Sequence, residues 1–413
     1  MRHGQGGASA ERGPAPASAV AEDHMTAKRS AALRAAVAPF IAMEVLSEAQ
    51  AIEAAGGSVV HMELGEPGAP APQGVREAAK RAIDRGLIGY TPSLGIPALR
   101  ERIARHYADT YGTRLDPARI AVTTGSSAGF ILAFLACFDP GDRVAIASPG
   151  YPAYRNILEA LSIEPVIIET GPADRWAVTP RAILAAHARE PLKGVLVMSP
   201  ANPTGVMMGG PAIAALAREC ERLGLWFISD EIYHGLTYEK PASTALSHSA
   251  DAVIVNSFSK YFCMTGWRIG WLVLPERLTR PLERLAQNLF ISPPYLSQVA
   301  AQASFDCRPE LERVREGYAE NRALLLEALP RMGLPDLLPV DGAFYVYGDV
   351  TRLTNDSVAF CRRALTEAGV AMTPGVDFDR ERGTGFVRLS FAGSPQNVRE
   401  GVERLGNWLR RGI

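Results

Sequence analysis

Seven short apolar runs, separated by stretches with helical patterning, constrain the fold of this chain more than any other feature. Most of them lack the polar–apolar alternation of a half-exposed strand, which is typical of strands covered on both faces. The runs are Ile120–Thr123, Val144–Ile146, Pro165–Ile168, Val195–Met198, Trp226–Ile228, Val253–Val255 and Ile269–Val273. Strands that alternate with helices predict an α/β fold with a mainly parallel central sheet flanked by helices. Ligands of such sheets bind beyond the carboxyl ends of the strands.

The two ends of the chain follow a different pattern, with helices and a few isolated strands. A chain of 413 residues is too long for one small core, so we expect two domains. The sequence favours a large domain over 73–307 and a smaller α+β domain that combines 25–72 with 308–413. The elements expected in the smaller domain are helices over Ala31–Ala55, Glu310–Leu329, Ser357–Glu367 and Gln396–Arg411, and strands over Val59–Met62, Ala343–Tyr347 and Gly385–Phe391.

Residues 1–24 are rich in Gly, Ala, Pro and Ser and contain no Phe, Tyr or Trp. They lack the apolar centre of a secretory signal, so we expect them to form a disordered extension. The sequence leaves open whether translation starts at Met1 or at Met25.

Composition argues against several other classes of protein. The formal net charge of −1 gives no overall attraction to nucleic acid or to an anionic membrane. The longest strongly apolar stretch, Ala128–Phe138, is too short to span a bilayer. The five cysteines are scattered and form no CxxC pair, and the histidines lie far apart. This pattern argues against a disulfide framework and a metal site, and it favours a cytoplasmic location.

Lys260 has the most distinctive surroundings of the five lysines. It ends the run Ser257-Phe258-Ser259-Lys260, which follows a predicted strand and precedes Gly-Trp-Arg-Ile-Gly with Arg268. A lysine amine can form an imine with an aldehyde cofactor, while hydroxyl and guanidinium groups beside it can hold a phosphate. Serine acyl-enzymes also use an SxxK motif, but their SDN and KTG elements are missing here. A lone lysine in such a place is more often an ordinary surface residue.

Two further motifs also follow predicted strands. Asp230, in Ser-Asp-Glu-Ile-Tyr, is a carboxylate that can keep a pyridine nitrogen protonated, and Tyr233 can donate to a phenolic oxygen of the same ring. Asn202 lies in Ser-Pro-Ala-Asn-Pro-Thr-Gly, a rigid turn that can present its amide inward. Taken singly, Asp230 would more often be a helix cap and Asn202 a plain loop residue.

Two more motifs complete the set. Ser126 and Ser127 stand in a small, hydroxyl-rich turn at a predicted helix start, which is a natural cup for a phosphate. The turn matches neither the Walker pattern nor GxGxxG, so neither a nucleoside triphosphate nor a dinucleotide is favoured. Tyr151 follows another strand and can stack on a flat ring. Alone, the serines would be ordinary caps and Tyr151 a core residue.

Together these motifs resemble the class I and II aminotransferases, the fold-type I enzymes that depend on pyridoxal 5'-phosphate. The resemblance covers roughly residues 35–410, and SFSK followed by GWRIG is highly specific. It implies that Lys260 carries the cofactor as a Schiff base and moves the proton, while Asp230 pairs with the ring nitrogen. The other implied cofactor contacts are Tyr233 and Asn202 at the ring oxygen, Tyr151 on the ring face, and Ser126, Ser127, Ser257 and Arg268 at the phosphate.

Three residues acquire a role only through this resemblance. Tyr90, in Gly-Tyr-Thr-Pro, matches a tyrosine that reaches the phosphate of the neighbouring subunit, which implies a homodimer with shared active sites. Arg388 matches the arginine that binds the substrate α-carboxylate as a bidentate fork, with Gly65 and Asn202 beside it. The implied reaction moves an amino group between an L-amino acid and a 2-oxo acid.

Two alternatives stay open at this point. The same fold and residues serve pyridoxal phosphate-dependent lyases and decarboxylases, because the motifs do not reveal which bond at Cα is broken. A non-catalytic regulator on this fold would need an appended DNA-binding module, of which the residues before the first helix give no sign. The amino donor is also open, although the apolar run Phe290–Tyr295 favours neutral side chains over dicarboxylates.

Overall fold

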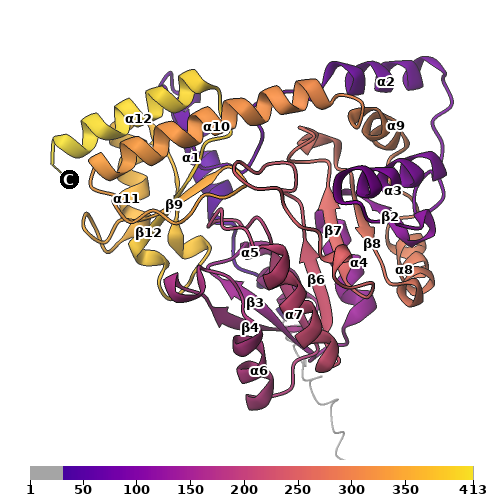
Figure 1. Ribbon diagram of the computed structural model, residues 1–413. Helices are drawn as coiled ribbons and strands as arrows, with labels where there is room; N and C mark the ends of the chain where they lie inside the picture. The colour runs from indigo at the N-terminus through magenta and orange to yellow at the C-terminus, as the bar shows by residue number, and fades with distance from the viewer. Residues whose placement is uncertain (1–30, 413) are drawn as a thin grey trace, which may run out of the picture.

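The computed structural model describes residues 31–412, so the expected disordered extension at 1–24 lies outside the described residues. Its central feature is a seven-stranded sheet in the order β2-β8-β7-β6-β5-β3-β4 (Figure 1). Neighbouring strands are parallel except at β8, which runs antiparallel to β2 and β7. The strands are β2 (Ile120–Thr123), β3 (Arg143–Ser148), β4 (Glu164–Glu169), β5 (Gly194–Met198), β6 (Trp226–Asp230), β7 (Val253–Ser257) and β8 (Gly270–Val273). All seven predicted runs are strands of this sheet, which confirms the predicted α/β fold.

Helices cover both faces of the sheet, because successive side chains of a strand point in opposite directions. On β5, Val195 and Val197 belong to a core that includes residues of α3, α6 and α7. Leu196, between them, belongs to a second core with residues of α4 and α8. Burial on both sides explains why these strands are apolar at nearly every position. The helices around the sheet are α2 (Gln73–Asp84), α3 (Pro97–Tyr111), α4 (Gly125–Cys137), α5 (Pro152–Ala160), α6 (Pro180–Arg189), α7 (Gly210–Arg222), α8 (Glu276–Leu289) and α9 (Tyr295–Ser304).

Elements from both ends of the chain build a smaller α+β unit, with α10 and α12 packed together beside β9 and β12 (Figure 1). Its three-stranded antiparallel sheet has the order β11-β12-β9, and β1 pairs in parallel with β10. The elements are α1 (Ile41–Ala54), β1 (Val60–His61), α10 (Arg308–Arg331), β9 (Tyr345–Asp349), α11 (Ser357–Arg363), β10 (Val370–Ala371), β11 (Thr373–Pro374), β12 (Phe386–Ser390) and α12 (Pro395–Arg410). The N-terminal segment thus joins the last third of the chain, while the domain boundaries at 73 and 307 stay a prediction.

One predicted helix is shorter than expected. The pattern favoured a helix over Ala31–Ala55, but α1 begins only at Ile41, after a short 3-10 turn at Leu33–Ala35. Pro39 disfavours a helical backbone at the residue before it. The Asp377 carboxylate then accepts the backbone N–H of Ile41 at 3.2 Å. An acceptor from the far end of the chain therefore determines where this helix begins.

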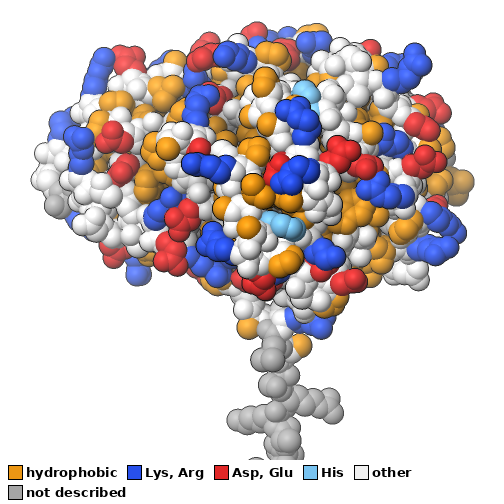
Figure 2. All heavy atoms as spheres, turned by 60° about the horizontal axis from the view of Figure 1, so that its bottom comes forward, with side chains coloured by type: hydrophobic (Ala, Val, Ile, Leu, Met, Phe, Trp, Pro, Cys, Tyr) orange, Lys and Arg blue, Asp and Glu red, His pale blue; other side chains and the backbone are white. Residues whose placement is uncertain are grey.

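The surface carries charges of both signs. Figure 2 shows Lys and Arg side chains interspersed with Asp and Glu over the face that it presents. This mixture agrees with the formal net charge of −1, since no large field of one sign results. Within residues 31–412, no helix has both the length and the apolar character that crossing a bilayer requires.

Candidate active site

A cavity of about 210 Å³ lies at the carboxyl ends of the central strands, between the sheet and the smaller unit. Its position is the one expected for a ligand site in a parallel α/β sheet. Most of the residues predicted from the sequence line this single pocket. They are Gly65, Ser126, Ser127, Tyr151, Asn202, Asp230, Tyr233, Lys260, Arg268 and Arg388. Two predicted residues, Ser257 and Tyr90, do not line it.

Lys260 lies in a turn that follows β7 and is anchored by the fully buried ring of Phe258. Its Nζ donates a hydrogen bond to the carbonyl oxygen of Gly65, which lies just after β1. Burial lowers the pKa of the Lys260 amine to about 8. A substantial fraction of the amine is therefore neutral near pH 7–8, as nucleophilic attack on an aldehyde requires.

Asp230 ends β6 and is buried, with 1% of its surface exposed. Its Oδ1 accepts the backbone N–H of Ile232 at 3.0 Å, and its Oδ2 accepts a hydrogen bond from the hydroxyl of Tyr154. Burial raises the pKa of Asp230 to about 7, because the charged form is poorly solvated there. A cation beside this carboxyl, such as a protonated ring nitrogen, would restore its ionised form. Asp230 therefore fits the role predicted for it.

An anion-binding corner forms at the start of α4, where Ser126 and Ser127 occupy the first turn and Arg268 approaches from the segment before β8. The approach is close. A Cβ added at Gly125, whose φ is +73°, would lie 2.5 Å from Arg268 Nη2. A Cβ at Gly270 would lie 3.1 Å from the backbone nitrogen of Ser126. Only glycine fits at these two positions. Helix N–H groups, hydroxyls and a guanidinium in one corner suit a phosphate dianion.

Ser257 lies next to this corner but does not line the pocket. Its hydroxyl donates to the carbonyl oxygen of Ile269 at 3.0 Å and lies 2.8 Å from the hydroxyl of Ser259. Ser259, which the sequence did not single out, is the serine of this motif that lines the pocket. The role predicted for Ser257 at a phosphate stays a prediction.

At the opposite end of the pocket, Arg388 projects from β12 and is 1% exposed. Its Nη1 donates to Asn202 Oδ1 at 3.0 Å, and its Nη2 donates to Thr373 Oγ1 at 3.2 Å. The guanidinium carbon lies 4.5 Å from the ring centroid of Tyr345 and 4.7 Å from that of Phe378. The Nε of Arg388 is buried and has no hydrogen-bond partner among the described residues. A donor left free in this way is suited to a carboxylate ligand.

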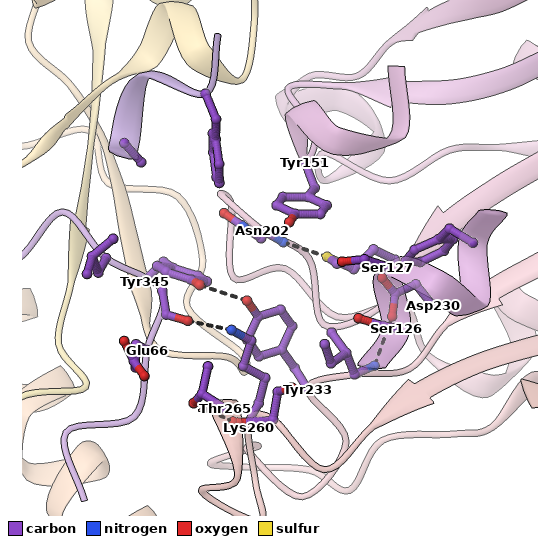
Figure 3. Close-up of a pocket in the computed structure, with 18 of the residues that line it drawn as sticks. Glu66, Ser126, Ser127, Tyr151, Asn202, Asp230, Tyr233, Lys260, Thr265 and Tyr345 are labelled. Carbon is purple, nitrogen blue, oxygen red and sulfur yellow. Dashed lines mark hydrogen bonds between the residues drawn. The ribbon is translucent and has the colours of Figure 1, made fainter. Parts of the chain in front are cut away.

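The sequence analysis missed two tyrosines: Tyr345, which lines the pocket drawn in Figure 3, and Tyr154, which contacts Asp230 without lining the pocket. Tyr345 Oη lies 2.7 Å from Tyr233 Oη, so the two hydroxyls form a pair on the side of Lys260 (Figure 3). Tyr154, the hydrogen-bond donor to Asp230, follows Tyr151 by three residues at the start of α5. Spacing of i and i+3 places two residues on one helix face, and this was the signal available for Tyr154.

Tyr90 and the run Phe290–Tyr295 lie apart from the pocket in this chain. Tyr90 is 84% exposed, and no residue of Phe290–Tyr295 lines the cavity. The two segments are neighbours, since the backbone N–H of Thr91 donates to Ser292 Oγ at 3.3 Å. Tyr90 therefore does not contribute to the pocket of its own chain, and any role at a site would be at the pocket of another chain.

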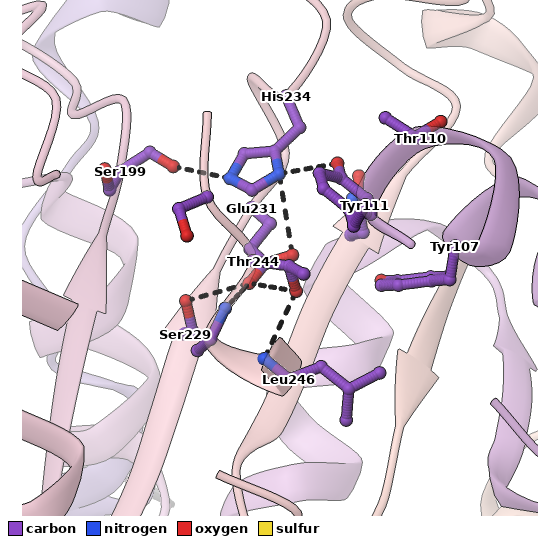
Figure 4. Close-up of polar contacts among 12 residues, drawn as sticks. Tyr107, Thr110, Tyr111, Ser199, Ser229, Glu231, His234, Thr244 and Leu246 are labelled. Carbon is purple, nitrogen blue, oxygen red and sulfur yellow. Dashed lines mark hydrogen bonds and ion pairs between the residues drawn. The ribbon is translucent and has the colours of Figure 1, made fainter. Parts of the chain in front are cut away.

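A buried polar network surrounds Glu231 and His234, which follow Asp230 in the sequence (Figure 4). His234 Nε2 is 3.0 Å from the carbonyl oxygen of Ser199, which can only accept, so Nε2 carries the hydrogen. The Nδ1 of His234 then accepts from the hydroxyl of Tyr111 at 2.7 Å. Burial lowers the pKa of His234 to about 3 and raises that of Glu231 to about 8. Both side chains are therefore uncharged at neutral pH.

Replacing Glu231 by glutamine should make stability less dependent on pH. The raised pKa means that the folded protein holds the Glu231 proton between pH 4.5 and about 8, whereas the unfolded chain loses it. Stability therefore falls as pH rises through this range, by roughly 2–5 kcal/mol for a shift of this size. Glutamine keeps the Oε1 that accepts the Ala245 N–H at 2.8 Å and carries no charge. Urea unfolding at pH 5, 7 and 9 measures the difference. The exposed Glu221→Gln is the control, and an unchanged pH slope in Glu231→Gln would contradict the assignment.

A mainly parallel α/β sheet, with a buried lysine, a buried carboxyl and an anion corner at the ends of its strands, defines the fold-type I class of pyridoxal phosphate enzymes. The family model for aminotransferase class I and II matches residues 58–405. The chain belongs to the class I and II aminotransferase family, and its enzymatic activity is that of an aminotransferase.

Individual relatives agree with this assignment. The chain is 49% identical over 384 residues to valine–pyruvate aminotransferase of Mycobacterium tuberculosis, covering 92% of this chain and 98% of the relative. It is 34% identical to the aspartate/prephenate aminotransferase of Thermus thermophilus, covering 91% of this chain and 97% of the relative. A crystal structure of an aminotransferase from M. tuberculosis superposes with a TM-score of 0.90 at 48% identity, covering 93% of this chain and 100% of that one.

Proposed function

We propose that this aminotransferase uses pyridoxal 5'-phosphate to transfer the amino group of a neutral aliphatic L-amino acid to a 2-oxo acid such as pyruvate. The observation that carries the proposal is the pairing of Lys260 and Arg388 in one pocket. Lys260 offers an amine of lowered pKa, and Arg388 offers a buried guanidinium with a free Nε. A substrate held by its carboxylate at Arg388 would present its α-amino group toward Lys260.

The residues of the pocket fit the cofactor. When bound, pyridoxal phosphate supplies an aldehyde carbon and a protonated ring that withdraws electrons from the substrate Cα. Lys260 would hold the aldehyde and move the proton between the substrate Cα and the cofactor, and Asp230 would keep the ring nitrogen protonated. Ser126, Ser127 and Arg268 would bind the phosphate. Tyr151 would cover the ring, and Tyr233 and Asn202 would hydrogen-bond its oxygen.

The choice of a neutral donor rests on the lining of the pocket. The side chains that the segments around α1 and β1 bring to it are apolar except for Glu66. The apolar ones are Phe40, Ala42, Met43 and Leu64. Among the described residues that line the pocket, the cations are Lys260, Arg268 and Arg388, and all three have other roles. A second substrate carboxylate would therefore be desolvated beside Glu66 without a partner. The name of the M. tuberculosis relative, valine–pyruvate aminotransferase, agrees with this choice.

A panel of amino donors assayed with pyruvate tests the proposal. We expect valine to exceed aspartate in kcat/KM by about tenfold or more, because an unpaired buried carboxylate is costly. Alanine formation should equal consumption of the donor. Preference for aspartate would contradict the neutral pocket. Release of ammonia or carbon dioxide without any oxo acid would favour the lyase or decarboxylase alternative instead.

Replacing Arg388 by lysine should raise KM for both the amino acid and the oxo acid. Lysine keeps the charge but loses the planar fork, and with it about two charge-assisted hydrogen bonds of ~1.5–3 kcal/mol each. We therefore expect kcat/KM to fall by roughly 10²- to 10⁴-fold, measured by steady-state kinetics. Arg399→Lys changes an exposed arginine of α12 and is the matched control. An unchanged KM in Arg388→Lys would exclude Arg388 from substrate binding.

We also propose that two chains share their active sites. Exposed apolar side chains gather around Tyr90 and the neighbouring segment, and patches of this kind are typical of subunit interfaces. They are Leu87, Ile88, Leu289 and Ile291. Light scattering should therefore give the mass of a dimer, and Tyr90→Phe should weaken cofactor binding. A fully active monomer would contradict this proposal.

A cytoplasmic location stays a prediction, supported by the five cysteines, each of which is unpaired.

A further inference from the structure

A second cavity, of about 180 Å³, is nearly as large as the catalytic pocket of about 210 Å³. Its walls come from α3, from the segments that follow β6 and β7, and from the junction of α9 with α10. Among the described residues, none lines both cavities. It is therefore a separate site, and the proposed reaction assigns it no role.

The two cavities share a wall. Tyr233 lines the catalytic pocket, whereas His234, the next residue, lines the second cavity. In the same way Lys260 faces the first and Tyr261 the second. His234 is held in place by Tyr111 and by the carbonyl oxygen of Ser199, as Figure 4 shows. A ligand that displaces the residues of this wall in the second cavity would also shift Tyr233 and Lys260 in the catalytic pocket.

The lining of the second cavity is rich in rings. His106 lies 5.2 Å from Phe305 between ring centroids, and Phe305 lies 5.0 Å from Phe262. Burial lowers the pKa of His106 to about 4, so this ring is neutral at physiological pH. Trp271 and Tyr261 add two further rings. Walls of this composition favour a flat aromatic ligand.

Two guanidinium groups also line the cavity. Arg102 has its guanidinium carbon 4.5 Å from the Phe305 ring centroid, and its Nη1 is buried without a partner among the described residues. Arg308 stands exposed at the rim. Of the two acids in the lining, Glu312 already accepts bonds from Tyr261 Oη and from an arginine on α10, each at 2.7 Å. Asp109 is exposed. The Nη2 of Arg102 meets the exposed Asp306 at 3.6 Å, so Nη1 is the donor that is left free. A free buried donor beside a second guanidinium favours an anionic acceptor.

We propose that this cavity is a second ligand site, which binds a small aromatic carboxylate. The ring of the ligand packs among His106, Phe262 and Phe305, and its carboxylate meets Arg102 and Arg308. Because the wall is shared, occupancy alters catalysis without competing for the substrate pocket. The site thus gives the enzyme a means of responding to aromatic acids.

Fluorine NMR with 4-fluorobenzoate tests the site on the cofactor-loaded enzyme. Isovalerate, an aliphatic acid without a ring, is added in excess to fill the carboxylate position at Arg388. We expect one equivalent of 4-fluorobenzoate per chain to stay bound. Arg308→Gln should weaken this binding by roughly tenfold, as loss of one charge-assisted hydrogen bond would. Arg313→Gln, an exposed position on the same helix outside the cavity, should leave it unchanged.

Several results would overturn the proposal. Complete displacement of 4-fluorobenzoate by isovalerate would mean that it binds only at the catalytic pocket. Equal weakening in Arg308→Gln and Arg313→Gln would mean non-specific attraction. In steady-state kinetics with the amino donor varied, we expect 4-fluorobenzoate to change kcat. Purely competitive inhibition would contradict the coupling through the shared wall. So would unchanged kinetics while 4-fluorobenzoate occupies the second cavity.

Discussion

Replacing Lys260 by alanine should abolish transamination, with kcat lowered by roughly 10⁴-fold or more. General acid–base catalysis by a positioned side chain contributes about 10²- to 10⁴-fold, and Lys260 would supply the covalent attachment as well. No other lysine lines the catalytic pocket, among the described residues, that could replace its amine. The measurement is steady-state turnover of the best donor with pyruvate.

The spectrum of the same variant provides an independent readout. In the wild-type protein, borohydride should fix the cofactor to the chain and abolish its visible absorbance. Lys260→Ala should lack the lysine-bound band and should not be labelled. Lys193→Ala removes an exposed lysine just before β5 and should behave as the wild type. Borohydride labelling that persists in Lys260→Ala would show that another amine carries the cofactor.

Replacing Asp230 by asparagine should have the next largest effect on kcat. Asparagine keeps the shape of the side chain and can still accept the Ile232 N–H, but it cannot balance a protonated ring nitrogen. Removing one partner of a buried charge pair costs about 3–5 kcal/mol. We therefore expect kcat to fall by roughly 10²- to 10⁴-fold, with weaker cofactor binding measured by dialysis.

Stability supplies a second test of Asp230. Without cofactor, its pKa of about 7 means that the folded state holds a proton that the unfolded chain loses from about pH 4 upward. Stability should therefore fall as pH rises toward 7, and Asp230→Asn should remove that part of the slope. Asp174→Asn, an exposed position, is the control. If Asp230→Asn were fully active with unchanged cofactor affinity, the pairing with the ring nitrogen would be excluded.

The sequence was sufficient to predict what depends on local pattern. Bare apolar runs such as Val253–Val255 identified every strand of the central sheet, because burial on both faces removes polar residues. The motifs around Lys260 and Asp230 were recognisable because strand-end chemistry requires particular residue types at fixed spacing. Arg388 came from the resemblance alone, and only the fold brings it to the same pocket.

The parts that escaped prediction depend on contacts between distant segments. The spacing from Tyr151 could point to Tyr154, but nothing local identifies its acceptor, Asp230, which is 76 residues away. The start of α1 depends on Asp377, which lies 336 residues beyond Ile41. The second cavity, likewise, is assembled from α3 and α10 and carries no motif of its own. Pairings over such separations follow from topology, which no short window of sequence contains.

The pairing of β1 with β10, which joins Val60 to Val370, has a consequence for how the protein is made. During synthesis the strands β2 to β8 emerge together and can pair while the ribosome is still translating. Val60, in contrast, can pair only after Val370, some three hundred residues later, has been synthesised. Arg388 emerges later still. A nascent chain can therefore position Lys260 and Asp230 well before Arg388 is available to bind a substrate. The complete active site forms only after the last strand, β12, has been synthesised.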